Sequence, residues 1–171
     1  QAGQPQAPCR ALPTGRAAPI LPGMRRLAHL LAVALMTVPA GPAPAWEIRP
    51  GPVCEMAHEG EAGTVRVTYD PAIGEYAIML TRMQGPWPDA AAFAITFRGA
   101  QGLTISTGRH VLSEGGRTLT VRDRGFGNVL RGLEAGGSAR AFAGAAAMEI
   151  DLAAAPPVVA AFRACRARPA V

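Results

Sequence analysis

The chain has 171 residues, 17 of them basic and 12 acidic, and every basic residue is an arginine. The lack of lysine excludes P-loop ATPases, which need a phosphate-binding lysine, and enzymes that form a lysine Schiff base. The net charge of +5 gives no support for nucleic-acid binding, because four arginines precede residue 46 and all acidic residues follow it, leaving residues 46–171 with 13 arginines and a balance of +1.

Residues 24–45 have the pattern of an export signal. Arg25 and Arg26 form a basic start, residues 27–38 are mostly apolar, and Ala43-Pro44-Ala45 places small residues before a cleavage point at Trp46. The apolar run is too short to span a bilayer, which takes about 20 residues. Residues 1–23 are rich in Ala, Pro, Gly and Gln, and we expect them to be a disordered upstream extension from a mis-assigned start. The pattern predicts a periplasmic protein with no transmembrane span after cleavage.

Cys54 and Cys165 are the two cysteines of the mature part. An even number of cysteines in an exported protein predicts a disulfide, here closing a loop of 111 residues. Two distant cysteines and two histidines are too few ligands for a zinc site. We therefore expect a disulfide between Cys54 and Cys165, and neither a metal nor a cofactor.

Short runs of alternating apolar and polar residues predict about eight strands in the mature part. In residues 64–70, for example, Val65, Val67 and Tyr69 share one face. Turns at 71–74 and at Gly115-Gly116 predict two hairpins. Nine ranges show a strand-like pattern, from which we expect the fold's roughly eight strands. In chain order they are 52–59, 63–70, 75–83, 92–98, 103–107, 109–112, 117–122, 138–143 and 147–152.

Two helices complete the predicted fold. Asn128 is a candidate cap for a short helix that ends near residue 135, before Gly136-Gly137. Pro156-Pro157 opens a last helix over 158–165, in which Val158, Phe162 and Cys165 form one apolar stripe. Short connections favour antiparallel pairing. The sequence predicts a mainly β (α+β) domain over 46–165, an antiparallel sandwich or barrel with these two helices, followed by a flexible tail at 166–171.

Arginines gather in residues 109–124, and they suggest a face that binds an anion or an acidic partner. Its candidate residues are Arg109, His110, Arg117, Arg122 and Arg124. A solvated hairpin surface is the competing interpretation. Trp87, between Pro86 and Pro88, is either a plug over one end of the core or an exposed recognition residue.

Evidence for catalysis is weak in this sequence. His58, His110, Ser106, Ser113 and Asp123 are the candidate residues of a hydrolase, but no serine lies in a GxSxG motif. The stretch Gly125-Phe126-Gly127-Asn128 faintly resembles a phosphate-binding loop, and a plain turn from strand to helix explains it better. We therefore expect a protein that is not an enzyme.

Several segments resemble a group of small exported proteins of Gram-negative bacteria. They are Trp46, Cys54-Glu55-Met56, LTISTGRH (103–110), LTVRDRGFGNVL (119–130) and Ala161-Phe162-Arg163-Ala164-Cys165. Such proteins are sometimes described as a component of the ABC excinuclease of DNA repair, a role that the missing lysine and the export signal argue against. The chain is more distantly similar to the invasion-associated locus B family of periplasmic proteins, although it lacks that family's second cysteine pair. Neither likeness assigns a functional residue.

Three functions remain open at this point. The first is a monomeric periplasmic binding module that contacts an envelope component or a protein partner through residues 109–124. The second is an inhibitor of a hydrolase that inserts the Trp87 loop. The third is a small hydrolase that uses His58 or His110.

Overall fold

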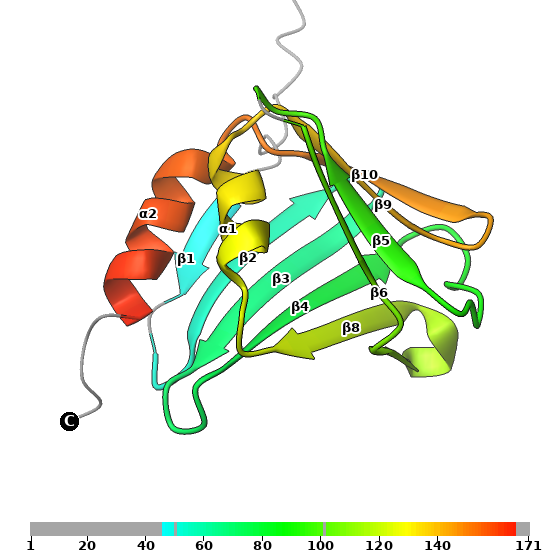
Figure 1. The fold of residues 1–171 in the computed structure, drawn as a ribbon, viewed down its shortest axis with the longest axis horizontal. Helices are drawn as coiled ribbons and strands as arrows, with labels where there is room; N and C mark the ends of the chain where they lie inside the picture. The colour runs from blue at the N-terminus through cyan, green and yellow to red at the C-terminus, as the bar shows by residue number, and fades with distance from the viewer. Residues whose placement is uncertain (1–45, 50, 101, 167–171) are drawn as a thin grey trace, which may run out of the picture. The chain divides into compact units, whose positions relative to one another are not determined.

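The computed structural model describes residues 46–49, 51–100 and 102–166, which are drawn in colour in Figure 1. The predicted export signal at 24–45, the predicted extension at 1–23 and the predicted tail beyond residue 166 lie outside these residues. Within the described part, the chain forms ten strands, one short 3-10 turn and two helices.

Six strands form an antiparallel sheet in the order β1-β2-β3-β4-β8-β7. The strands are β1 (Trp46–Arg49), β2 (Cys54–Gly60), β3 (Gly63–Asp70), β4 (Glu75–Arg82), β7 (His110–Ser113) and β8 (Thr118–Asp123). The predicted hairpin of residues 63–83 lies at the centre, where Val65 pairs with Leu80 and Val67 with Ile78. In its turn, the backbone N–H of Ala72 donates to Asp70 Oδ1 at 2.9 Å, a role that aspartate commonly has in turns.

Four strands form the second antiparallel sheet, in the order β10-β9-β5-β6. The strands are β5 (Phe93–Phe97), β6 (Leu103–Thr107), β9 (Ser138–Ala143) and β10 (Ala146–Asp151). The predicted mainly-β antiparallel fold is thus confirmed. It is a sandwich of two open sheets and not a closed barrel. β1 has only four residues, too few to show a period of two, and the sequence pattern did not predict it.

The 3-10 turn Glu114–Gly116 closes the second predicted hairpin, in which Ser113 pairs with Thr118. All three of its residues have a positive φ, at 53°, 66° and 85°. Glycine adopts this conformation freely, whereas Glu114 adopts it at a steric cost. The carboxylate of Glu114 accepts a hydrogen bond of 2.7 Å from the Thr118 hydroxyl, which holds the turn against the strand that follows it.

The core lies between the facing sides of the two sheets. The alternating residues of the long strands supply it, as the period of two predicted, and Val65, Val67 and Leu80 are 0% exposed. The second sheet contributes large side chains from β5 and small ones from β9, so that the two layers interdigitate. These side chains are Phe93, Ile95, Phe97, Ala139, Ala141 and Ala143.

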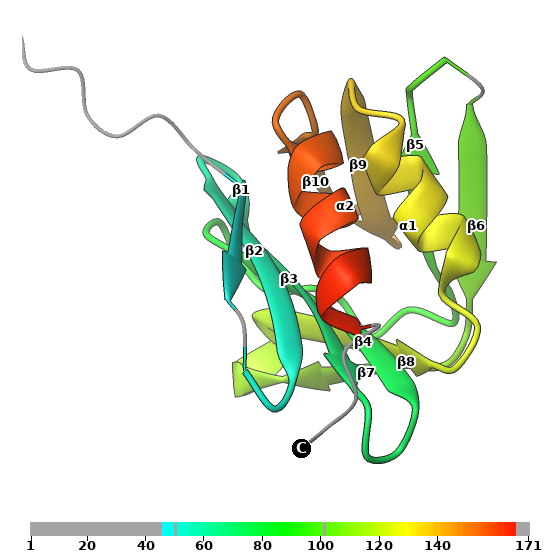
Figure 2. The same cartoon turned by 90° about the vertical axis from the view of Figure 1, so that its left-hand side faces the viewer.

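The helices α1 (Gly127–Glu134) and α2 (Ala155–Arg166) lie side by side at one end of the sheets (Figures 1 and 2). In α2 the most deeply buried residues are Ala155, Val159 and Phe162, each 0% exposed. Val158 and Cys165 of the predicted stripe are partly buried against the core, and Val159, which the predicted stripe did not include, is buried as well. Among the described residues, neither helix has the length and apolar character needed to cross a bilayer.

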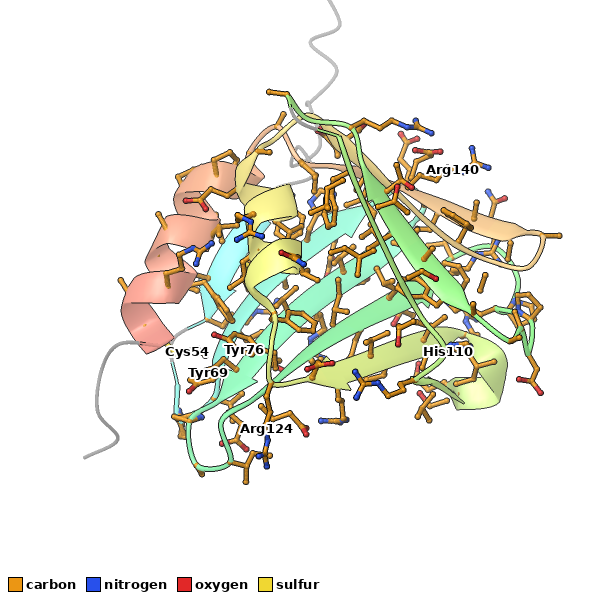
Figure 3. The ribbon with its side chains drawn as sticks, viewed as in Figure 1. Cys54, Tyr69, Tyr76, His110, Arg124 and Arg140 are labelled. Carbon is orange, nitrogen blue, oxygen red and sulfur yellow. A yellow bond between two sulfur atoms is a disulfide. The ribbon has the colours of Figure 1, made fainter. Side chains whose placement is uncertain are left out.

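The predicted disulfide is present. Cys54, the first residue of β2, is bonded to Cys165 near the end of α2 across a separation of 111 residues, with a Cα–Cα distance of 6.1 Å. Cys54 lies beside Tyr69, its partner in the register of β3 (Figure 3). A second link joins the start of the fold to its end, because Trp46 Nε1 donates to the carbonyl oxygen of Asp151 at 2.9 Å. The first two strands are therefore linked to β10 and α2, the last two elements of the described fold.

Candidate functional site

A cleft of about 150 Å³ is lined by strands of both sheets and by the start of α1. Its floor is apolar and consists of buried side chains from β4, β5, β8 and α1, together with half-buried Ile105 of β6. The buried floor residues are Ile78, Phe93, Ile95, Val121, Phe126 and Val129. A cavity of this volume is about large enough for a benzene ring.

The mouth of this cleft is polar and carries two opposite charges. Arg109 Nη2 donates to Asp123 Oδ2 at 2.6 Å, and the backbone N–H of Gly125 donates to Asp123 Oδ1 at 3.0 Å. The Gly125 N–H, followed by the charge of Arg109, holds the pKa of Asp123 below its usual range, although desolvation acts in the opposite direction. Both charges are therefore present at neutral pH, at side chains that are 78% and 35% exposed.

Arg109 and Asp123 both lie at the ends of strands, at points where the chain leaves a sheet. Between β6 and β7 it passes from the four-stranded sheet to the six-stranded sheet through Gly108 and Arg109, and the Arg109 N–H donates to Thr107 Oγ1 at 3.0 Å. At the end of β8, Asp123 begins the turn that leads into α1. The β6–β7 connection and the end of β8 thus bring Arg109 and Asp123, which are 14 residues apart in sequence, together at the mouth of the cleft.

The mouth retains capacity for further hydrogen bonds. An arginine side chain has five N–H donors, and each carboxylate oxygen can accept more than one hydrogen bond. Ser106, Thr107 and Asn128 add polar groups at the rim. An apolar floor beneath a few converging polar groups is typical of sites that bind small molecules.

The five residues of the predicted anion-binding face have different partners. Arg109 lines the cleft, whereas Arg122 lies on β8 and pairs with Glu75 at 3.3 Å. Arg117 and Arg124 are exposed, and within the described part of the chain no ion pair involves either side chain. Arg124 lies in the turn between β8 and α1 (Figure 3).

His110, the remaining member of that set, is half-buried. Its ring centroid lies 6.4 Å from that of Phe93, and its Nδ1 has no hydrogen-bond partner among the residues that the structure describes. His110 thus lies partly buried against an aromatic ring, on the edge strand β7.

The candidate hydrolase residues have other partners. His58 is 3% exposed and stacks on Trp46, with 5.0 Å between the ring centroids. Ser106 donates to the carbonyl oxygen of Phe93 at 3.2 Å, and Asp123 accepts hydrogen bonds from Arg109 and Gly125. The hydrogen bonds of Ser106 and Asp123 therefore position the strands and the turn rather than activating a nucleophile.

Trp87 is part of the core, as the plug interpretation expected. Its side chain is 2% exposed, and its Nε1 donates to the carbonyl oxygen of Leu80 at 2.9 Å. The guanidinium of Arg82 covers the ring at 5.2 Å from its centroid, a cation–π contact. The backbone N–H of Trp87 donates to the carbonyl oxygen of Gly116 at 2.7 Å, which ties the loop to the 3-10 turn.

The stretch 125–128 is a turn from strand to helix, and the prediction that Asn128 caps α1 is wrong. Phe126 occupies the cap position and makes no side-chain cap hydrogen bond. Asn128 lies inside the first turn, where its Oδ1 accepts a hydrogen bond from Arg131 Nη2. The buried Phe126 ring, stacked on Tyr76 at 5.3 Å, holds the start of α1 on the sheet in place of a polar cap.

Three larger hollows in the described part of the chain are less suited to a ligand. One, of about 420 Å³, is lined by His58 and Asp151 among others, and a second, of about 360 Å³, lies between Phe97 and Arg131. The third, of about 330 Å³, is lined by Arg82 among others. Most of the residues that line them are exposed or half-exposed, so that a ligand there would lose little contact with water. Within the described residues no group of three or more His, Cys, Asp or Glu is arranged to hold a metal ion.

Sequence reasoning identified Arg109 and Asp123 separately and missed the cleft that joins them. The apolar floor residues were assigned to the core, because their periodicity is the same whether or not space is left beside them. A comparison of this chain with protein-family models, with curated proteins and with solved structures finds no match.

Proposed function

We propose that this chain is a non-catalytic binding protein of the periplasm, and that its ligand site is the cleft that opens at Arg109 and Asp123. The observation that carries the proposal is the combination of a buried apolar floor with an exposed, charged mouth. Such a site gives affinity through the floor and specificity through the mouth. Among the described residues that line it, Ser106 donates to a backbone carbonyl oxygen and not to a base, and binding is the activity that the site supports best.

A periplasmic location is supported by the disulfide and by the export pattern in the sequence. Disulfides persist in oxidising compartments and are rare in the cytosol. The bridge between Cys54 and Cys165 joins the two ends of the fold and would stabilise it outside the cell. A monomer remains our expectation, and the charge balance gives no reason to propose a nucleic-acid partner.

Neither alternative is favoured by a specific observation. An inhibitor that inserts Trp87 would need this side chain at the surface, whereas it is 2% exposed. A hydrolase would need a base next to a nucleophile, whereas Ser106 donates its hydrogen bond to a backbone carbonyl oxygen. The contact of Arg117 and Arg124 with an acidic partner remains a prediction.

The proposal can be tested by blocking the cleft. The oxidised protein is mixed with the small-molecule fraction of a periplasmic extract, and the amide NMR signals of Gly125, Asn128 and Ser106 are followed. Ile105→Phe, which places a ring in the cleft, is compared with Thr104→Phe, which places the same ring on the outward side of the same strand.

We expect signals at the cleft to shift in the wild type and in Thr104→Phe and to stay unchanged in Ile105→Phe. The amide spectrum without extract shows whether each variant is folded. Shifts that are equal in all three proteins, or that cluster away from the cleft, would refute the proposed site.

A further inference from the structure

We infer that the cleft binds a free α-amino acid with a compact apolar side chain, an inference that rests on the proposed function and names the ligand class of the same site. The apolar side chain would fill the floor. The α-carboxylate would contact Arg109, and the α-ammonium would contact Asp123. The geometry points to this class because the mouth carries one positive and one negative group within 2.6 Å of each other.

The paired charges discriminate against ligands that carry a single charge. A carboxylate that approaches Arg109 also approaches Asp123, and an amine that approaches Asp123 also approaches Arg109. Because the two charges of the site are adjacent, attraction and repulsion nearly cancel for either ligand. A zwitterion can place each of its charges beside the opposite charge of the site, so that both interactions are attractive.

The pair can accept such a ligand without being broken. Arg109 uses one of its nitrogens, Nη2, in its bond to Asp123, and the donors on its other nitrogens can bind a carboxylate. The two oxygens of Asp123 offer about four acceptor sites, which the N–H groups of Arg109, Gly125 and Arg124 do not fill, so that a site remains for an ammonium. The site is therefore organised before the ligand arrives, which lowers the entropic cost of binding.

The floor selects the side chain. The cleft has a volume of about 150 Å³, and its floor of Ile78, Ile95 and Val121 suits an aliphatic group or a single ring. No charged group lines this floor among the described residues, since Arg109 and Asp123 lie at the mouth. A polar side chain placed there would lose its hydrogen bonds to water without replacement.

The inference can be tested with L-leucine and three matched ligands, using titration calorimetry on the oxidised protein. 4-Methylpentanoate lacks the ammonium, isoamylamine lacks the carboxylate, and glycine lacks the apolar side chain. We expect leucine to bind at least tenfold more tightly than each of them, because each lacks one of the three contacts. Equal binding of leucine and 4-methylpentanoate, or no binding of leucine, would overturn the inference.

Two charge variants test whether Arg109 and Asp123 recognise the two charges of the ligand. Asp123→Asn should weaken the binding of leucine at least tenfold. It should strengthen the binding of 4-methylpentanoate, because the carboxylate of this ligand is no longer repelled by Asp123. Arg109→Gln should likewise weaken the binding of leucine and strengthen the binding of isoamylamine, whose ammonium is no longer repelled by Arg109. Arg140→Gln is the control, since this exposed arginine of β9 pairs with Glu149 and does not line the cleft. A loss of structure would weaken all ligands together and would not produce these opposite changes.

The outcome separates this inference from the proposed function. If the periplasmic extract shifts the cleft signals while leucine does not bind, the amino-acid assignment is refuted and the binding site stands. If neither the extract nor leucine has an effect at the cleft, both are refuted.

Discussion

Gly132 of α1 lies against the ring of Phe97, and we expect the substitution Gly132→Ala to destabilise the protein. A Cβ at position 132 would lie 2.4, 2.5 and 2.7 Å from three carbon atoms of that ring. Carbon atoms in contact are normally about 3.5–4.0 Å apart, so that helix and ring would have to separate by about 1 Å. Phe97 is 1% exposed, and a shift of its ring would disturb the core contacts around it.

The expected size follows from two opposing effects. Alanine favours a helix over glycine by about 1 kcal/mol. Overpacking of a buried contact costs about 1–3 kcal/mol. The approach of 2.4 Å places this contact in the upper part of that range, about 2–3 kcal/mol. We therefore expect a net decrease of about 1–2 kcal/mol in the free energy of unfolding, measured by urea denaturation followed by circular dichroism, with an unchanged m-value.

The same helix offers a matched control. Gly127→Ala adds a Cβ that meets nothing within 4 Å, and this variant should be as stable as the wild type or slightly more stable. Phe97→Leu should relieve the clash, so that Gly132→Ala costs less in that background than in the wild type. If Gly132→Ala were as stable as Gly127→Ala, or if the costs of Gly132→Ala and Phe97→Leu simply added, the argument from close packing would be refuted.

Three further predictions concern the other features that hold the fold together. Replacing both Cys54 and Cys165 by alanine should lower the free energy of unfolding by about 5 kcal/mol in urea denaturation, the value of the chain-entropy model for a loop of 111 residues. Trp87→Phe should cost about 1–3 kcal/mol in the same assay, because it removes the hydrogen bond to Leu80. Since the pKa of Asp123 is lowered by folding, its contribution is present above the usual carboxyl pKa of about 3.9 and is lost as the pH falls through the lowered value. The wild type should therefore exceed Asp123→Asn in stability at pH 6 and lose that advantage in acid.

Each of these three predictions has a result that would contradict it. For the disulfide, the contradicting result is a decrease of less than about 1 kcal/mol in the free energy of unfolding. It would mean that the bridge hardly constrains the unfolded chain. For Trp87, it is an effect no larger than that of Met83→Ala, a side chain that is 65% exposed. For Asp123, it is a difference between wild type and variant that stays constant from pH 6 to the acid range.

The sandwich could be predicted from the sequence because its determinants are local. In β3 apolar and polar residues alternate, and the register of Val65 with Leu80 follows from the length of the turn. The disulfide was also predictable, since two cysteines allow one intramolecular pairing. β1 could not be predicted in this way, because a strand of four residues has too short a pattern.

The site depends on how distant segments meet, and a local pattern does not contain that information. Arg109 was assigned to a basic face because arginines surround it in sequence, but its partner in space is Asp123, and Arg122 points to a different partner, Glu75. The cap of α1 was misassigned for a similar reason. Asn128 has the chemistry of a cap, whereas the ring of Phe126 fixes where the helix begins by stacking on Tyr76.

The bridge between β2 and α2 also has a consequence for biogenesis. Cys54 is synthesised near the start of this domain, and its partner is made 111 residues later. Covalent closure therefore has to wait until nearly the whole domain has emerged. A product that stops before α2 would keep a thiol open to alkylation, so that the oxidation state of Cys54 reports whether a molecule was completed.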